Sequence, residues 1–147
     1  MRTIGIAVWG LGSHAIKRIL PALDSMKQIS LVGICSRNQH NIDEQSFAWD
    51  CIGWTDPLEM LKNNHVDVVY IASPIGIHAS QALQALNSGK HVWCEKPLSC
   101  KHQDTKSLVH IAKNKGLMLA ESFMYMHHSQ YKTAQDFISK GENGLLK

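Results

Sequence analysis

The opening of the chain constrains its fold more than any other segment. Residues 3–9 are a short, almost continuous apolar run that ends at Gly10, which is typical of a strand buried on both faces of a parallel sheet. Apolar residues then recur at helical spacing over 16–26, where Pro21 predicts a kink or a break in the helix hydrogen bonds. A strand, a glycine turn and a helix in this order predict the start of an α/β fold.

Strand and helix patterns continue to alternate along the rest of the chain. Further strands are expected at 30–35, 52–54, 66–72, 91–94 and 117–120. Helices are expected around 44–49, where the pattern is weak, and at 56–63, 79–86, 99–114 and 131–138. Strands that alternate with helices are joined by right-handed crossovers, so the predicted fold class is α/β, a Rossmann-type doubly wound parallel sheet.

Local signals mark the ends of several of these helices. Asp56 followed by Pro57 predicts an N-cap and a first-turn proline. Ser99 is the expected N-cap of the helix over 99–114. Gly89 and Gly116 are placed to end the two helices that precede them.

The composition is that of one domain of ordinary size. The 147 residues are 44% hydrophobic and 18% charged, against about 25% charged residues on average, so a core can form and disorder is not expected. No apolar run is long enough for a transmembrane helix and no signal peptide is recognised, so a cytoplasmic location is expected. The net charge is +3 and the basic residues are scattered, which argues against a nucleic-acid partner.

The cysteines and histidines show no metal-binding pattern. No two of the four cysteines have C-x-x-C spacing, and they are expected to be reduced thiols. His127 and His128 are adjacent, so their side chains project in different directions, and no acidic or cysteine partner stands at a suitable spacing. No metal site is therefore expected.

The segment from Gly10 to Ala15 matches the dinucleotide-binding pattern G-x-G-x-x-A. In that pattern the first glycine allows a tight turn, the second lets the backbone approach a pyrophosphate, and the alanine allows the helix to pack closely on the strand. The position between the first strand and the first helix favours this interpretation, and a purely structural turn is the alternative. The candidate cofactor-binding residues here are Gly10, Leu11, Gly12, Ser13 and His14.

The end of the second strand bears on which dinucleotide is bound. The pattern expects an Asp or Glu about 20 residues after the turn, which binds the adenosine ribose. Cys35, Ser36 and Arg37 stand there instead, and the next carboxylate is Asp43. An arginine beside a hydroxyl side chain suits a 2′-phosphate, so NADP is favoured over NAD, with Ser36 and Arg37 as ligands. The alternative is that Arg37 is a solvated loop residue.

Two further motifs follow the fourth and fifth expected strands. One is Ala72-Ser73-Pro74 with His78 beyond it, and the other is Glu95-Lys96-Pro97. Together with the glycine turn, these motifs resemble those of the glucose–fructose oxidoreductase and inositol dehydrogenase family (Gfo/Idh/MocA). That family typically carries A-[ST]-P-x-x-x-H and E-K-P near these positions.

The resemblance covers essentially the whole chain. It includes the segment from Glu121 to Tyr125 and the terminal segment from Gly141 to Gly144. One departure follows Tyr125, where the family often has Arg and then His-Pro, whereas Met126 and Ser129 stand at the corresponding places. If that arginine contributes to the cofactor or substrate side, its replacement puts activity in doubt.

The resemblance implies roles for individual residues. Lys96 would be the catalytic lysine beside the nicotinamide and the substrate, where a cation polarises a carbonyl or assists loss of a hydroxyl proton. Glu95 would help to orient the site. His78 either lines the cofactor cleft or only satisfies local backbone groups. The candidate cofactor-binding residues that these motifs add are Ala72, Ser73, Pro74, His78, Glu95 and Lys96.

The resemblance also implies a larger protein, because family members continue into an α+β domain. That domain supplies further acid/base residues, most substrate contacts and the oligomer interface. Residues 1–122 would be the NAD(P)-binding domain, and 123–147 the connecting helix and the start of the second domain, which is absent from this chain. The expected function is the NAD(P)-binding half of an oxidoreductase that transfers hydride between nicotinamide and a sugar, cyclitol or related hydroxyl or carbonyl compound.

Two other interpretations stay open at this point. The chain could be a stand-alone NADP-binding sensor or partner module without catalysis, or an inactive truncated product. An intact Lys96 favours the enzyme, because a pure sensor needs no such lysine. In the enzyme, a small-molecule substrate would bind only with the second domain, and the full-length form would be a homo-oligomer.

Overall fold

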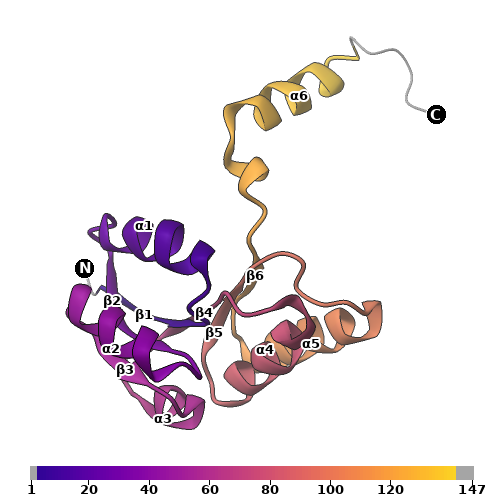
Figure 1. Cartoon of the computed structure of the whole chain (residues 1–147). Coiled ribbons are helices and arrows are strands. Elements are labelled where there is room, and N and C mark those ends of the chain that lie inside the picture. The colour runs from indigo at the N-terminus through magenta and orange to yellow at the C-terminus, as the bar shows by residue number, and fades with distance from the viewer. Residues whose placement is uncertain (1–2, 142–147) are drawn as a thin grey trace.

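A computed structural model describes residues 3–141, which contain a six-stranded sheet (Figure 1). Its strands are β1 (Ile4–Trp9), β2 (Ile29–Cys35), β3 (Ile52–Trp54), β4 (Val68–Ile71), β5 (His91–Cys94) and β6 (Leu119–Glu121). Their order is β3-β2-β1-β4-β5-β6, and every neighbouring pair is parallel. The strand order reverses between β1 and β4, so the predicted doubly wound, Rossmann-type sheet is confirmed.

Helices cover both faces of the sheet. They are the π-helical turn η1 (Ala15–Ile19), α1 (Leu20–Asp24), α2 (Gln39–Ala48), α3 (Pro57–Lys62), the 3₁₀ turn η2 (Ile75–Ile77), α4 (His78–Asn87), α5 (His102–Lys115), the 3₁₀ turn η3 (Met124–His127) and α6 (Ser129–Ser139). α1 and α2 pack on one face, whereas α3, α4 and α5 pack on the other (Figure 1). Within the described residues, no helix has both the length and the apolar character needed to cross a membrane.

β1 lies at the centre of the core. Ile6 and Val8 pack in the cluster under α1 and α2, whereas Ala7 and Trp9 belong to the cluster under the other helices. All four side chains are buried. A strand with both faces covered needs a nearly continuous apolar sequence, which is the pattern seen at the start of the chain.

The first helix changes from π-helical to α-helical next to Pro21, where the sequence predicts a kink or a break in the hydrogen bonds. The π-helical turn η1 ends at Ile19, and α1 begins at Leu20 with Pro21 in its first turn. Proline has no N–H to donate, so it is tolerated in the first turn of a new helix but not inside a continuous one.

The expected helix ends are confirmed at some positions and wrong at another. Asp56 caps α3, because its Oδ1 accepts a hydrogen bond from a first-turn amide at 2.8 Å. Gly116 ends α5 in the left-handed conformation, with φ of 65°. Ser99 does not cap α5, whose N-cap is Lys101. The Ser99 hydroxyl instead donates to the Lys101 carbonyl at 2.7 Å and shapes the turn before the helix.

α2 begins earlier than the weak pattern around 44–49 suggests. It starts at Gln39 because the side chain of Asn38 accepts a hydrogen bond from Asn41 N at 3.2 Å. Only Ile42 and Gln45 of this helix are buried, so its sequence carries little apolar periodicity.

Beyond β6 the chain leaves the sheet. η3 and α6 extend away from the layers of strands and helices (Figure 1). Apolar side chains are exposed on both elements, among them Met124 and Tyr125 on η3 and Phe137 on α6. The expected start of a second domain, and the terminal segment after Gly141, lie outside the described residues.

Candidate functional site

The loops that follow β1, β2 and β4 form one cleft at the carboxyl edge of the sheet. The cleft has a volume of about 600 Å³. The predicted site residues that line it are Gly10, Leu11, Gly12, Ser36, Arg37, Ala72, Ser73 and Pro74. The cleft lies where the strand order reverses, which is the place where open α/β sheets bind their ligands.

The turn after β1 requires glycine at its first position. Gly10 has φ of 107°, and a Cβ there would lie 2.6 Å from both Ser73 N and Ser73 Oγ. Gly10 N donates to the Cys35 carbonyl at 2.8 Å, and Ser73 Oγ donates to the Trp9 carbonyl at 3.1 Å. The absence of a side chain at Gly10 therefore allows the loops after β1 and β4 to touch.

The second glycine and the alanine of this turn serve different purposes. A Cβ at Gly12 would meet no heavy atom within 4 Å, so the backbone there faces open space. Ala15 is completely buried at the start of η1, which packs closely on the sheet. These are the geometries that the G-x-G-x-x-A pattern needs for a phosphate to approach the backbone.

The loop after β2 places a cation at the edge of the cleft. Arg37 is exposed, and the neighbouring Ser36 is held because its N donates to the Trp54 carbonyl at 3.1 Å. Ser36 Oγ also accepts a hydrogen bond from Asn38 N at 3.2 Å. Among the described residues, no Asp or Glu lines the cleft.

The cleft also contains residues that the sequence did not indicate. They are Trp9, Cys35, Asn38, Thr55, Pro57, Ile77 and Gln81. The fold places them there from the ends of β1, β2 and β3 and from the start of α4, and no local motif marks them. Burial, with a smaller effect of Asp56, raises the pKa of the Cys35 thiol to about 12, so this side chain is uncharged at neutral pH.

A second group of polar side chains surrounds Glu95, directly after β5. Glu95 Oε1 accepts a hydrogen bond from the Tyr70 hydroxyl and lies 3.2 Å from His14 Nε2. The Tyr70 hydroxyl is also 3.4 Å from Ser122 Oγ. Burial, and then the bond to Glu95, raise the pKa of Tyr70 well above its usual value, so the hydroxyl keeps its proton and donates to the carboxylate. The group connects the glycine turn with the ends of β4, β5 and β6.

Lys96 follows Glu95 at the same edge of the sheet and is exposed. Lys96 N lies 3.4 Å from Glu95 Oε2, and the peptide bond between Lys96 and Pro97 is cis. Leu98 N donates to Glu121 Oε1 at 2.8 Å, which anchors the far end of this loop on β6. The predicted residues that do not themselves line the cleft are Ser13, His14, His78, Glu95 and Lys96.

His78 is buried beneath these loops, with 1% of its surface exposed. Its Nε2 lies 2.7 Å from the Ser73 carbonyl oxygen, and its Nδ1 lies 2.8 Å from the Pro97 carbonyl oxygen. The side chain therefore joins the loop after β4 to the loop after β5. The sequence left open whether His78 lines the cofactor cleft or only satisfies local backbone groups, and this placement corresponds to the second interpretation.

A family model decides the relationship of the chain to known proteins. The model GFO_IDH_MocA, described as "Oxidoreductase family, NAD-binding Rossmann fold", matches residues 4–123. The chain belongs to the Gfo/Idh/MocA family. The match includes the glycine turn and both later motifs, so the resemblance that those motifs indicate is confirmed.

The Gfo/Idh/MocA chain is similar to curated oxidoreductases that act on sugars and cyclitols. It is 33% identical over 147 residues to dTDP-3,4-didehydro-2,6-dideoxy-alpha-D-glucose 3-reductase of Streptomyces violaceoruber, covering 100% of this chain and 43% of that protein. It is 29% identical over 124 residues to scyllo-inositol 2-dehydrogenase (NADP(+)) IolU of Bacillus subtilis (strain 168), covering 84% of this chain and 38% of that protein.

A solved structure shows the same arrangement of elements. The crystal structure of KijD10, a 3-ketoreductase from Actinomadura kijaniata in complex with NADP and TDP-benzene, matches with a TM-score of 0.89 at 31% identity. The match covers 95% of this chain and 43% of that chain. The Gfo/Idh/MocA chain thus spans less than half the length of these relatives.

Two members of the group around Glu95 were missed from the sequence. Tyr70 stands in β4 among aliphatic residues, and Ser122 directly follows β6. A tyrosine in a buried strand needs a hydrogen-bond partner for its hydroxyl, which is the signal that could have indicated it. No comparable signal marks Ser122.

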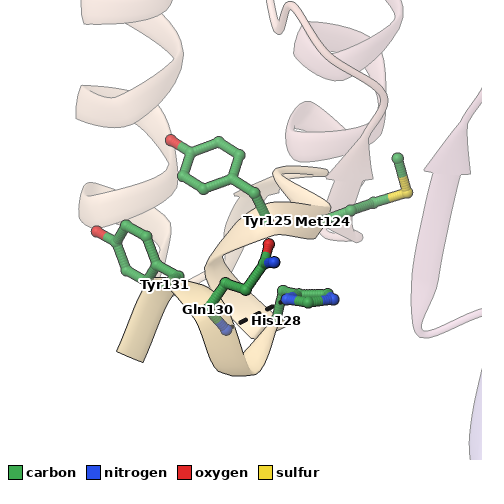
Figure 2. Close-up of a pocket in the computed structure, with 5 residues that line it drawn as sticks. All are labelled: Met124, Tyr125, His128, Gln130 and Tyr131. Carbon is green, nitrogen blue, oxygen red and sulfur yellow. Dashed lines mark hydrogen bonds between the residues drawn. The ribbon is translucent and has the colours of Figure 1, made fainter. Parts of the chain in front are cut away.

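A further hollow lies on η3 and α6, beyond residues 4–123 that the family model matches. Figure 2 shows the residues that line it, which are Met124, Tyr125, His128, Gln130 and Tyr131. His128 caps α6, because its Nδ1 accepts a hydrogen bond from Gln130 N at 3.2 Å. Within residues 3–141, no three His, Cys, Asp or Glu side chains come together as a metal site.

Proposed function

We propose that this chain binds NAD(P), with a preference for NADP, as the cofactor-binding half of an oxidoreductase. The complete enzyme transfers hydride between nicotinamide and a sugar, cyclitol or related hydroxyl or carbonyl compound. The observation that carries this proposal is the single cleft in which the loops after β1, β2 and β4 meet, with Gly10 against Ser73. The names of the related 3-reductase and inositol dehydrogenase support the reaction class.

The residues of the cleft fit a dinucleotide. The open backbone at Gly12 suits a pyrophosphate, because no side chain blocks its approach. The adenosine half lies toward the end of β2, where such folds bind the ribose, and there Ser36 and Arg37 are the ligands. The nicotinamide half then lies toward the ends of β4 and β5, near Ser73, Pro74 and the loop that carries Lys96.

The charge at the end of β2 supports the preference for NADP. A carboxylate at this place repels a 2′-phosphate, and the described lining of the cleft contains none. Arg37 instead offers a guanidinium, which binds phosphate through two charge-assisted hydrogen bonds. NADP in the names of IolU and of the KijD10 complex supports the same preference.

Lys96 is the proposed catalytic residue. The nicotinamide, when bound, supplies or accepts the hydride. The Lys96 ammonium stabilises negative charge on the reacting oxygen during reduction and assists loss of the hydroxyl proton during oxidation. Glu95 is a positioning residue, because its carboxylate is held by Tyr70 and His14 and it directly precedes Lys96.

The proposed enzyme has a second domain. Residues 1–122 are the NAD(P)-binding domain, and 123–147 are the connecting helix and the start of the domain that contacts the substrate. Substrate binding depends on that domain, and the full-length protein is a homo-oligomer. The length of the relatives supports this organisation, because they are more than twice as long as their match to this chain.

Fluorescence titrations of the chain with NADPH and NADH test the cofactor proposal. NADPH is expected to bind at least about tenfold more tightly than NADH, because hydrogen bonds between the Arg37 guanidinium and the 2′-phosphate join charged groups and are stronger than those between neutral groups. Arg37→Ala is expected to remove this preference, because it lowers the affinity for NADPH much more than the affinity for NADH. Arg18→Ala is the matched control, since Arg18 is an exposed residue of η1 that does not line the cleft. If neither nucleotide binds below millimolar concentration, the proposed function is wrong.

A further inference from the structure

One buried polar atom in the cleft has no hydrogen-bond partner within the described residues. It is Oε1 of Gln81, in the first turn of α4, and the residue is 7% exposed. The other buried polar side chains have polar partners: Gln45 Oε1 accepts from Trp49 Nε1 at 3.2 Å, and each ring nitrogen of His78 lies within hydrogen-bond distance of a carbonyl oxygen. A buried acceptor without a donor is destabilising, and such exceptions in folded proteins call for an explanation. Because Gln81 lines the cleft, a ligand in the cleft can provide the missing donor.

The position of Gln81 indicates which part of the dinucleotide it meets. The cleft residues nearest to the adenosine end are those that follow β2 and β3, namely Arg37, Thr55 and Pro57. α3, which begins at Pro57, packs on the same face of the sheet as α4, so Gln81 lines the cleft from the same face as Pro57. The flat ring of Pro57 and the guanidinium plane of Arg37 are surfaces on which a purine packs.

The chemistry of an amide oxygen selects one group on that purine. Gln Oε1 accepts hydrogen bonds and cannot donate them. The exocyclic 6-amino group of adenine is a donor, and the terminal amide torsion of glutamine is soft enough to turn the oxygen toward it. Resting on the proposed NAD(P) function, we propose that Gln81 is a specificity-determining residue that accepts a hydrogen bond from the adenine 6-amino group.

A titration with two cofactors tests this proposal. The probes are NADPH and reduced nicotinamide purine dinucleotide phosphate, which carries hydrogen in place of the 6-amino group and so has neither donor nor acceptor there. The wild-type chain is expected to bind NADPH about tenfold more tightly than this analogue, because the analogue leaves Gln81 Oε1 without a donor. In Gln81→Leu the preference is expected to fall to within about twofold. Gln84→Leu is the matched control, since Gln84 is exposed on the same helix and is expected to keep the full preference.

The outcomes separate this inference from the cofactor proposal. If neither nucleotide binds the wild-type chain, the proposed NAD(P) function fails. If both bind equally, the cofactor site stands and the role of Gln81 is refuted. Equal weakening of both nucleotides by Gln81→Leu, with the preference retained, also refutes it. The wild-type comparison needs no variant, so a folding defect in Gln81→Leu leaves the inference testable.

Discussion

Alanine in place of Gly10 is expected to destabilise the fold, because the new methyl group would collide with the backbone of the loop after β4. The added Cβ would lie 2.6 Å from Ser73 N and Ser73 Oγ, and 2.8 Å from the carbonyl carbon of Ala72. The Ser73 hydroxyl can rotate away, but the two backbone atoms can move only with their loop. That loop is held in place, because His78 bonds to the Ser73 carbonyl.

The magnitude follows from two contributions. A residue with a Cβ at φ of 107° is strained by about 1–2 kcal/mol or more, and overpacking against backbone adds about 1–3 kcal/mol. The expected loss is therefore about 3 kcal/mol of unfolding free energy. In urea this loss lowers the midpoint of unfolding by about 1–3 M, given the slopes of about 1–3 kcal/mol/M that are typical of small domains. Far-UV circular dichroism during a urea titration measures this shift in the midpoint.

Two other glycines provide matched controls for this experiment. A Cβ at Gly12 or at Gly76 would meet no heavy atom within 4 Å, so neither alanine variant is expected to shift the urea midpoint. Gly12→Ala is expected to weaken NADPH binding about tenfold or more, because the methyl group stands where the pyrophosphate approaches. Gly76→Ala is expected to change neither property. A wild-type midpoint in Gly10→Ala would refute the packing argument, and unchanged NADPH affinity in Gly12→Ala would remove Gly12 from the phosphate site.

Three further predictions concern stability. Tyr70→Phe is expected to lower the unfolding free energy by about 1–3 kcal/mol, because Glu95 loses a buried hydrogen-bond donor. Ser122→Ala is expected to lower it less, because Ser122 Oγ is 3.4 Å from the Tyr70 hydroxyl. Equal urea midpoints for the two variants would contradict this prediction. Lys90→Met is expected to lower the unfolding free energy by about 1–3 kcal/mol in the same urea titration, because Lys90 Nζ donates to the carbonyls of Asn63 and Val66 at 2.8 and 2.9 Å. Lys113→Met, at an exposed position, is the control and is expected to leave the midpoint unchanged. Unfolding free energy is expected to fall as pH rises above 9, because burial raises the pKa of Cys35 and of Cys94 to about 12 and the unfolded thiols ionise first. The slope is about 1.4 kcal/mol per pH unit per thiol, and a stability that stays flat to pH 10.5 would argue against buried thiols.

The order of strands and helices could be predicted from the sequence because most strands are short apolar runs and several helices begin at a capping residue or end at a glycine. A change in the helix hydrogen bonds at Pro21 could be predicted from the missing N–H of proline, whereas the π-helical form of the preceding turn could not. α2 was harder to place because its start depends on the side chain of Asn38 and only Ile42 and Gln45 are buried. The expected cap at Ser99 was wrong because a serine near a helix start can equally bond within the preceding turn.

The site could be predicted only as far as its motifs extend. Gly10 and Arg37 lie in motifs or at strand ends, and the structure brings them to one cleft. Tyr70 and Gln81 lie within a strand and a helix, where they look like ordinary members of each element. Their roles depend on neighbours that are distant in sequence, such as Glu95 for Tyr70. Tertiary proximity of this kind is not encoded in a local pattern.

The buried imidazole of His78 makes one wall of the cleft more rigid than the other. Separating the loops after β4 and β5 would strip both ring nitrogens of their partners, so these loops behave as one stiff block. The opposite wall ends in Arg37, whose side chain is exposed. A dinucleotide that enters the cleft is therefore expected to meet a fixed surface at the ends of β4 and β5, and ordering on binding is expected mainly at the exposed Arg37 side chain.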